Sequence, residues 1–212
     1  MLRAAYLAAY PHGFTGRDHG DFAPPSSAPA RLLATLALPG PYAAASQVHG
    51  NRLASVPFEA EVPEADAVLT RLPGSCVAVR VADCVPILLA APGAVAAVHA
   101  GWRGTAADIV RHAVQALGAG EGLRAAIGPC IRGCCYEVGE EVIDRVAAVA
   151  PGRAWLSARH VDLAVANAAI LAELGVATEI VGPCTRCDPQ YWSHRRDGAS
   201  AGRQVGAIGL PP

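Results

Sequence analysis

The hydrophobic pattern of the chain centres on two apolar runs, residues 81–89 and 97–100, on either side of the turn-forming pair Pro92-Gly93. Continuous apolar runs of this kind between turn signals predict buried β-strands. The second run leads through a glycine-rich turn into a helix expected after Gly104. Thr105 and Asp108 have the spacing of a capping box, and Gly118 is a natural end for that helix.

The remaining pattern predicts strands interspersed with helices. The further strands are expected at residues 2–10, 43–48, 52–56, 66–70, 76–81, 124–131, 176–181 and 204–210. The further helices are expected at residues 30–38, 139–150 and 163–174, the last capped by Asp162. Several strands follow one another without a helix, with residues 52–56 as the returning arm of a hairpin. This order favours an α+β protein with a mixed sheet or sandwich over a doubly wound sheet. Without a repeat or a linker, residues 1–212 are expected to form a single domain.

Composition limits the partners. The formal net charge of -1 argues against a nucleic-acid coat or a membrane-surface patch. No signal peptide is recognisable and no apolar run reaches about 18 residues, so a cytoplasmic protein is expected. In that compartment the seven cysteines are expected to be thiols or metal ligands.

Three residues with metal-binding side chains, His49, Cys84 and His99, each stand at the end of a predicted strand. Two imidazoles, a thiolate and an open position describe a catalytic zinc site. Each residue also has a simpler interpretation, because an isolated cysteine in an apolar run is commonly a small buried side chain.

Two basic segments could recognise an anion. Arg103 lies between Gly101 and Gly104, where backbone N–H groups and a guanidinium suit phosphate. The alternative is a helix start that merely requires small residues. Residues 193–198, followed by Arg203, form a basic loop that could close over an anionic substrate or simply be solvated.

A second group of cysteines lies outside these runs. Cys184 and Cys187 have the spacing of a metal knuckle, but Cys130, Cys134 and Cys135 do not provide a second pair with regular spacing. We therefore expect these five residues to form neither a disulfide nor a second zinc site.

Several motifs resemble those of the YfiH/YlmD family, which is also named for a supposed polyphenol-oxidase laccase domain. The similar segments are 47–50, 82–86, 98–104, 127–130, 135–139, 193–197 and 202–203. The resemblance implies a mixed β-sandwich flanked by helices in α/β/β/α layers. It implies zinc, with copper as an alternative, held by His49, Cys84 and His99. It also implies phosphorolysis of adenosine, inosine, guanosine and methylthioadenosine, accompanied by adenosine deamination.

Roles for individual residues follow from this reading. Arg103 is expected to bind phosphate together with Gly101 and Gly104, and Arg195 and Arg203 are further substrate-binding candidates. Asp83 and Glu137 are candidates for proton transfer, although Asp83 could instead orient a ligand. The expected partners are purine nucleosides and phosphate, with no nucleic acid and no membrane, and the oligomeric state is open.

Three other functions stay open. In a cysteine-nucleophile amidohydrolase acting on cell-wall precursors, Cys84 would attack and His99 would be its base. A copper-binding polyphenol oxidase is poorly supported, because the chain has seven histidines and no His-x-His pair. A non-enzymatic metal or redox protein would bind metal without turning over nucleosides.

Overall fold

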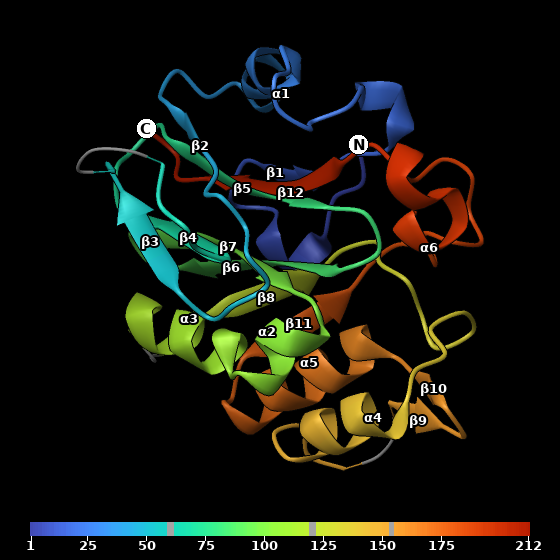
Figure 1. Cartoon of the computed structure of the whole chain (residues 1–212). Helices are drawn as coiled ribbons and strands as arrows, with labels where there is room; N and C mark the ends of the chain where they lie inside the picture. The colour runs from blue at the N-terminus through green and yellow to red at the C-terminus, as the bar shows by residue number, and fades with distance from the viewer. Residues whose placement is uncertain (59–61, 119–121, 153–154) are drawn as a thin grey trace.

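Four layers follow one another in the order helix, sheet, sheet, helices (Figure 1). The computed structural model describes residues 1–58, 62–118, 122–152 and 155–212. Helix α1 (Ala28–Leu36) covers the outer face of a four-stranded sheet, and α3 (Ile109–Leu117) and α5 (Leu163–Glu173) cover the outer face of a six-stranded sheet. The predicted α+β sandwich with α/β/β/α layers is confirmed.

The four-stranded sheet has the order β1-β12-β5-β2. Its strands are β1 (His12–Phe14), β12 (Gln204–Gly209), β5 (Cys76–Val81) and β2 (Tyr42–Ala43). Strand β12 is antiparallel to both of its neighbours, whereas β2 runs parallel to β5. The last strand, β12, therefore lies inside this sheet, between β1 and β5.

The six-stranded sheet has the order β11-β8-β6-β7-β4-β3. Its strands are β11 (Ala177–Ile180), β8 (Arg124–Ile127), β6 (Val85–Ala91), β7 (Ala94–Ala100), β4 (Ala67–Thr70) and β3 (Leu53–Val56). Successive side chains of a strand point to opposite faces. In β6, Ile87 and Leu89 accordingly pack under the helices, and Leu88 and Ala90 pack against the other sheet. Both faces of this strand are buried, which explains its continuous apolar run.

The other elements are short or lie at the periphery. They are the 3-10 helices η1 (Ala5–Leu7), η2 (Arg17–His19) and η3 (Gly198–Ser200), the helices α2 (Trp102–Ala106), α4 (Glu140–Ala147) and α6 (His194–Asp197), and the strands β9 (Leu156–Ser157) and β10 (His160–Val161). Among the described residues, no helix is long and apolar enough to cross a membrane.

The structure corrects several predicted elements. The strand expected at residues 2–10 is wrong: this segment contains η1, and the first strand is β1, which begins after it. Residues 43–48 contribute little more than the end of β2, and β3 pairs with β4 in parallel instead of forming a hairpin. The helix expected after Gly104 begins at Trp102 and is interrupted at Asp108, which has φ 61° and no capping side-chain bond.

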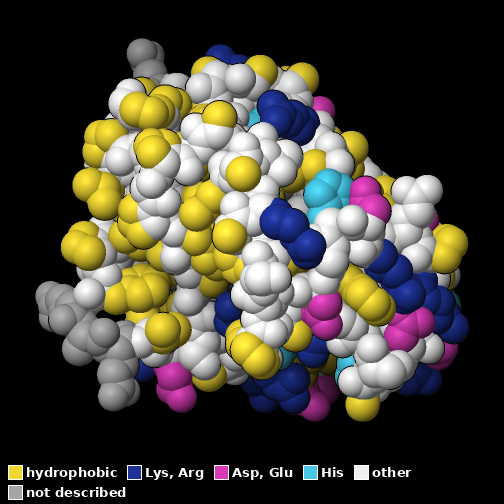
Figure 2. All heavy atoms as spheres, turned by 90° about the horizontal axis from the view of Figure 1, so that it is seen from above, with side chains coloured by type: hydrophobic (Ala, Val, Ile, Leu, Met, Phe, Trp, Pro, Cys, Tyr) yellow, Lys and Arg dark blue, Asp and Glu magenta, His cyan; other side chains and the backbone are white. Residues whose placement is uncertain are grey.

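Charged groups are unevenly distributed over the surface. Seen from the α1 side, basic, acidic and histidine side chains gather on one half of the face, whereas the other half is largely apolar (Figure 2).

Candidate metal centre and its pockets

Strand pairing brings Cys84 and His99 to the same end of the six-stranded sheet. In the antiparallel pair of β6 and β7, Pro86 lies opposite His99 and Val85 lies opposite Ala100. Cys84 immediately precedes β6, so its thiol lies beside the imidazole near the end of β7. His49 comes from the segment between β2 and β3, where it has φ 61°.

Asp66 hydrogen-bonds both the imidazole of His99 and the backbone of the turn that contains His49. Its carboxylate is fully buried and accepts a hydrogen bond from Nδ1–H of His99 at 2.8 Å. The same carboxylate accepts backbone N–H bonds from Val48 at 3.2 Å, His49 at 3.0 Å and Gly50 at 2.7 Å. These bonds hold the turn that presents His49 and leave Nε2 of His99 free for a ligand. Sequence reasoning missed Asp66, whose only signal is a charged residue at the start of an apolar strand.

The side chains of His49, Cys84 and His99 offer a compact set of metal donors. One ligand atom from each lies within 4.8 Å of the other two, and the two imidazole rings meet edge to face with centroids 4.8 Å apart. A Cβ on Gly101 would lie 3.1 Å from Sγ of Cys84 and 3.4 Å from Cδ2 of His49. A side chain at 101 would therefore crowd the trio and displace Cys84 or His49 by a few tenths of an ångström.

The electrostatics of the trio favour a thiolate. Burial raises the pKa of Cys84, but the charge of His99 and hydrogen bonds with His49 and His99 outweigh it and lower this pKa to about 6. Burial lowers the pKa of His99, but Cys84 and the hydrogen bond to Asp66 raise it to about 9. A thiolate and two imidazoles, one oriented by a buried carboxylate, fit the donor set and the supporting carboxylate of a zinc site.

Two pockets meet at His49. The first, of about 400 Å³, contains all three donor residues and the basic side chains Arg80, His194 and Arg203. The second, of about 490 Å³, is bordered by Trp102, Arg103, Glu141 and Arg145 as well as His49. Both volumes are in the range of small-molecule sites. Sequence reasoning missed Arg80, which no motif distinguishes from other surface residues, and His194 was noted only as part of the basic loop 193–198.

The residues predicted to bind phosphate or substrate do not lie in one pocket. Arg203 lies in the first pocket, whereas the guanidinium of Arg103 stacks on the ring of Trp102, 4.3 Å from its centroid, in the second. Arg195 lies over the ring of Tyr136 and donates to the carbonyl of Glu137. Gly104 lies inside α2, where a Cβ would approach the carbonyl of Gly50 to 3.1 Å, so its small size serves packing.

The predicted proton-transfer groups lie outside both pockets. Asp83 is 8% exposed, has φ 89°, and uses one carboxylate oxygen to accept from the Thr185 hydroxyl and the other to accept from the backbone N–H of Arg195. Both carboxylate oxygens of Asp83 are therefore engaged by Thr185 and Arg195. Glu137 is exposed, and its carbonyl accepts from Arg195.

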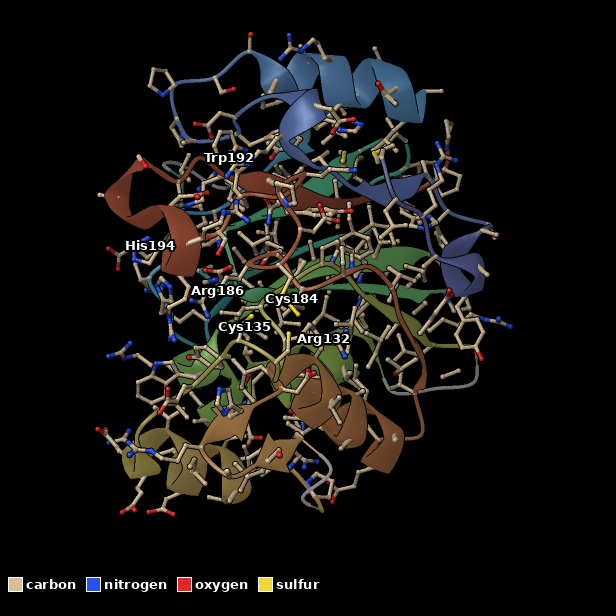
Figure 3. All side chains as sticks on the ribbon, turned by 90° about the vertical axis from the view of Figure 1, so that its right-hand side faces the viewer. Arg132, Cys135, Cys184, Arg186, Trp192 and His194 are labelled. Atoms are coloured by element: carbon tan, nitrogen blue, oxygen red, sulfur yellow. The ribbon has the colours of Figure 1, made fainter. Side chains whose placement is uncertain are left out.

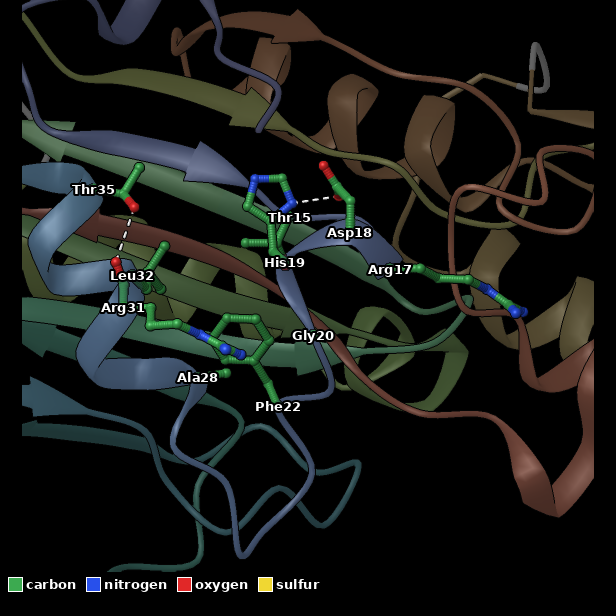
Figure 4. Close-up of a pocket in the computed structure, with 10 residues that line it drawn as sticks. All are labelled: Thr15, Arg17, Asp18, His19, Gly20, Phe22, Ala28, Arg31, Leu32 and Thr35. Atoms are coloured by element: carbon green, nitrogen blue, oxygen red, sulfur yellow. Dashed lines mark hydrogen bonds and ion pairs between the residues drawn. The ribbon is translucent and has the colours of Figure 1, made fainter.

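A separate pocket of about 440 Å³ lies between η2 and α1 (Figure 4). None of the expected site residues borders it. Several of its polar groups are engaged already: His19 is paired with Asp18, Thr35 donates to the carbonyl of Arg31, and Arg17 is paired with Asp197. We assign it no role.

Known proteins share both the fold and much of the sequence. The family model described as multi-copper polyphenol oxidoreductase laccase matches residues 26–211. A purine nucleoside phosphorylase of Deinococcus radiodurans is 38% identical over 241 residues, covering 100% of this chain and 93% of its own. A prokaryotic protein named adenosine deaminase RL5 is 40% identical over 172 residues, covering 71% of this chain and 64% of its own. The crystal structure of YlmD from Geobacillus stearothermophilus superimposes with a TM-score of 0.86 at 30% identity, covering 99% of this chain and 94% of that one.

A four-layer sandwich with a His-Cys-His cluster at the end of a sheet is the combination of fold and site that this chain presents. The extent of the matches to known proteins shows its family. The chain belongs to the laccase-like family that includes YfiH and YlmD, as its motifs indicated. Its relatives are named for purine nucleoside processing.

Proposed function

We propose that the protein is a zinc-dependent purine nucleoside phosphorylase that also deaminates adenosine, with His49, Cys84 and His99 as the metal ligands. The observation that carries the proposal is the placement of this trio in one pocket with Arg80 and Arg203. Within the described residues, neither arginine forms an ion pair with a carboxylate. Two cations without a protein anion suit phosphate.

In phosphorolysis, a phosphate oxygen forms a bond to ribose C1′ as the bond from C1′ to the purine breaks. The electron pair goes to the purine nitrogen, which takes up a proton. Arg80 and Arg203 would hold and orient the phosphate, and positioning of this kind accounts for much of the rate of a two-substrate reaction. A zinc ion held by the trio would supply Lewis-acid chemistry at an oxygen of substrate or water.

We place the nucleoside in the neighbouring pocket, with its sugar towards His49. Trp102 and Arg103 border that pocket and offer an apolar surface and hydrogen-bond donors. We propose that the substrates of phosphorolysis include adenosine, inosine, guanosine and methylthioadenosine. Deamination would use the same nucleoside with water as the second reactant, releasing ammonia from C6.

The test is a phosphate titration with adenosine, in which ribose 1-phosphate and inosine are measured from the same incubation. Removing a charge-assisted contact costs roughly 1.5–3 kcal/mol, which is about 10- to 150-fold in affinity. Arg203→Ala should raise the KM for phosphate by about that factor and leave deamination much less affected. Arg124→Ala, which removes an exposed charge on β8, is the matched control and should change neither product.

Arg103→Ala distinguishes the two possible phosphate-binding sites, one at Arg80 and Arg203 and the other at Arg103. If Arg103 serves the nucleoside, this substitution should depress both products. If it raises the KM for phosphate alone, phosphate binds where the sequence motif first suggested. Release of free base at the same rate without phosphate would contradict phosphorolysis altogether.

A second candidate is the cysteine-nucleophile amidohydrolase, favoured by one observation. Without metal, the lowered pKa of Cys84 beside the raised pKa of His99 describes the thiolate-imidazolium pair of such enzymes. The two functions differ in their response to metal. Chelation should abolish a zinc-dependent reaction, whereas it should activate a cysteine nucleophile by freeing its thiolate.

A further inference from the structure

Four cysteines outside the pockets converge at one point. Cys134 and Cys135 lie between β8 and α4, and Cys184 and Cys187 lie between β11 and α6. Their four sulfur atoms all lie within 4.8 Å of one another. Figure 3 shows Cys135 and Cys184 close to each other. The fold thus assembles a cluster that their irregular spacing did not predict.

The separations of Cys134, Cys135 and Cys187 are close to those of one face of a metal–sulfur tetrahedron, and Sγ of Cys184 lies within 4.8 Å of all three. With Zn–S bonds of about 2.3 Å, the edges of a regular tetrahedron of four sulfurs are about 3.8 Å. The distance is 3.7 Å from Cys134 to Cys135, 3.8 Å from Cys134 to Cys187 and 3.3 Å from Cys135 to Cys187.

Backbone hydrogen bonds hold the two loops of the cluster, and one N–H group is directed at a sulfur atom. The N–H of Arg132 points at Sγ of Cys184 at 3.4 Å, and the N–H of Cys187 closes the Cys-x-x-Cys turn on the carbonyl of Cys184 at 3.1 Å. On the other loop, the N–H groups of Cys135 and Tyr136 both donate to the carbonyl of Arg132. Hydrogen bonds from N–H groups stabilise the charged form of a thiol.

We propose that Cys134, Cys135, Cys184 and Cys187 form a tetrathiolate site for a second, structural zinc ion. Four cysteines without an open position are the ligand set of structural zinc sites. Cys130 is not a member, although its backbone bridges to that of Cys184: its side chain is fully buried, and burial raises its pKa.

The position of this site gives the ion a defined task. Thr185, inside the Cys-x-x-Cys turn, donates to Asp83, the residue before Cys84. Arg196 donates to the carbonyls of Thr185 and Arg186, and the N–H of Arg195 donates to the other oxygen of Asp83. The ion would therefore link two segments. One contains Cys184 and Cys187 and leads to His194 beside the catalytic pocket, and the other is the loop before α4.

The competing chemistry for these thiols is oxidation. The sulfur atoms of Cys135 and Cys187 lie 3.3 Å apart, closer to each other than either lies to that of Cys134, so an oxidant would join this pair as a disulfide. Oxidation of two thiols to a disulfide removes two electrons and two protons and destroys the ligand set. Zinc binding and disulfide formation therefore exclude each other. This makes the state of the thiols a decisive observation.

The test counts metal ions in the full-length protein, purified without chelator, by native mass spectrometry and elemental analysis. We expect two zinc ions per chain, and one in either Cys187→Ser or Cys134→Ser. Cys84→Ala should lose the other ion, and Cys84→Ala/Cys187→Ser should lose both. Cys76→Ser and Cys130→Ser replace buried cysteines outside either ligand set and should keep both ions.

A measurement on the unmodified chain removes any dependence on how the variants fold. After exchange with ¹¹³Cd, the NMR spectrum should show two signals, one of them shifted as a tetrathiolate site requires. A single signal without tetrathiolate character, or a Cys135–Cys187 disulfide found by non-reducing peptide mapping, would overturn the proposal. The count is independent of the reaction, so failure of the proposed activity would leave it intact.

Discussion

Replacing Asp66 by asparagine tests whether one buried carboxylate builds the candidate metal centre. Oδ1 accepts from His49 N–H and His99 Nδ1–H, and Oδ2 accepts from the N–H groups of Val48 and Gly50. An asparagine keeps an acceptor on one side only and turns an NH₂ group towards the two remaining donors. Asp66→Asn therefore removes two hydrogen bonds and the negative charge without changing the volume.

The expected magnitude follows from these contacts. Hydrogen bonds to a charged group contribute about 1.5–3 kcal/mol each, so the loss of two should lower the free energy of unfolding by at least about 3 kcal/mol. Loss of a carboxylate that orients a metal-binding histidine typically lowers metal affinity by about 10- to 100-fold. We expect both effects, with the loss of zinc confined to the His-Cys-His site.

The assay must distinguish this site from the four-cysteine cluster. Chelator competition followed by iodoacetamide labelling and peptide mapping does so, because a metal-bound Cys84 thiolate is protected from alkylation. Asp83→Asn is the matched control: it also removes a buried carboxylate, but one that holds Thr185 and Arg195 and touches neither histidine. It should lower stability while Cys84 stays protected at the same chelator concentration as in the wild type.

One result would refute the reasoning. If folded Asp66→Asn protects Cys84 at the same chelator concentration as the wild type, the carboxylate is a structural group of the 48–50 turn. The metal would then depend on the ligands alone.

Three further substitutions test other parts of the structure. Gly101→Ala should lower turnover by up to ~100-fold, seen in steady-state kinetics, because its Cβ would lie 3.1 Å from Sγ of Cys84 and displace it. Ile87→Ala should lower the free energy of unfolding in urea by about 2–5 kcal/mol, because its side chain is fully buried in β6. His12 has its pKa lowered by burial, with Arg3 also lowering it and a backbone bond to Tyr10 opposing this shift. The unfolded chain therefore binds the proton first, and stability should fall as pH drops below about 6.5; His12→Gln should reduce that slope, and an unchanged slope would show that other groups cause it.

The long apolar strands could be predicted from the sequence, because their pattern follows directly from burial. The strand expected at residues 76–81 has these bounds as β5, and Asp162 caps α5 by accepting from Val165 N–H. Strands β1 and β2 were not predictable from local pattern. They have three and two residues and exist because β12 and β5, distant in sequence, offer paired edges.

The candidate site shows the same division. His49, Cys84 and His99 could be picked out because strand ends present side chains to a shared pocket, and the fold does bring them together. Asp66 and the members of the pocket wall, such as Arg80, depend on register between strands and carry no local signal. The convergence of the four cysteines could not be predicted for a related reason: spacing describes one loop, whereas this cluster is made by two.

The buried carboxylate of Asp66 also bears on which metal the protein carries. Because it orients the imidazole of His99 and holds the turn that presents His49 before any ion arrives, most of the donor set is preorganised and discriminates little between ions by its geometry. The identity of the bound metal ion then depends on the type of ligand and on which metals are available. Nitrogen and sulfur donors bind copper more strongly than zinc. The ion found in a preparation would therefore report the metals available during growth, and nucleoside turnover should be compared between zinc-loaded and copper-loaded protein.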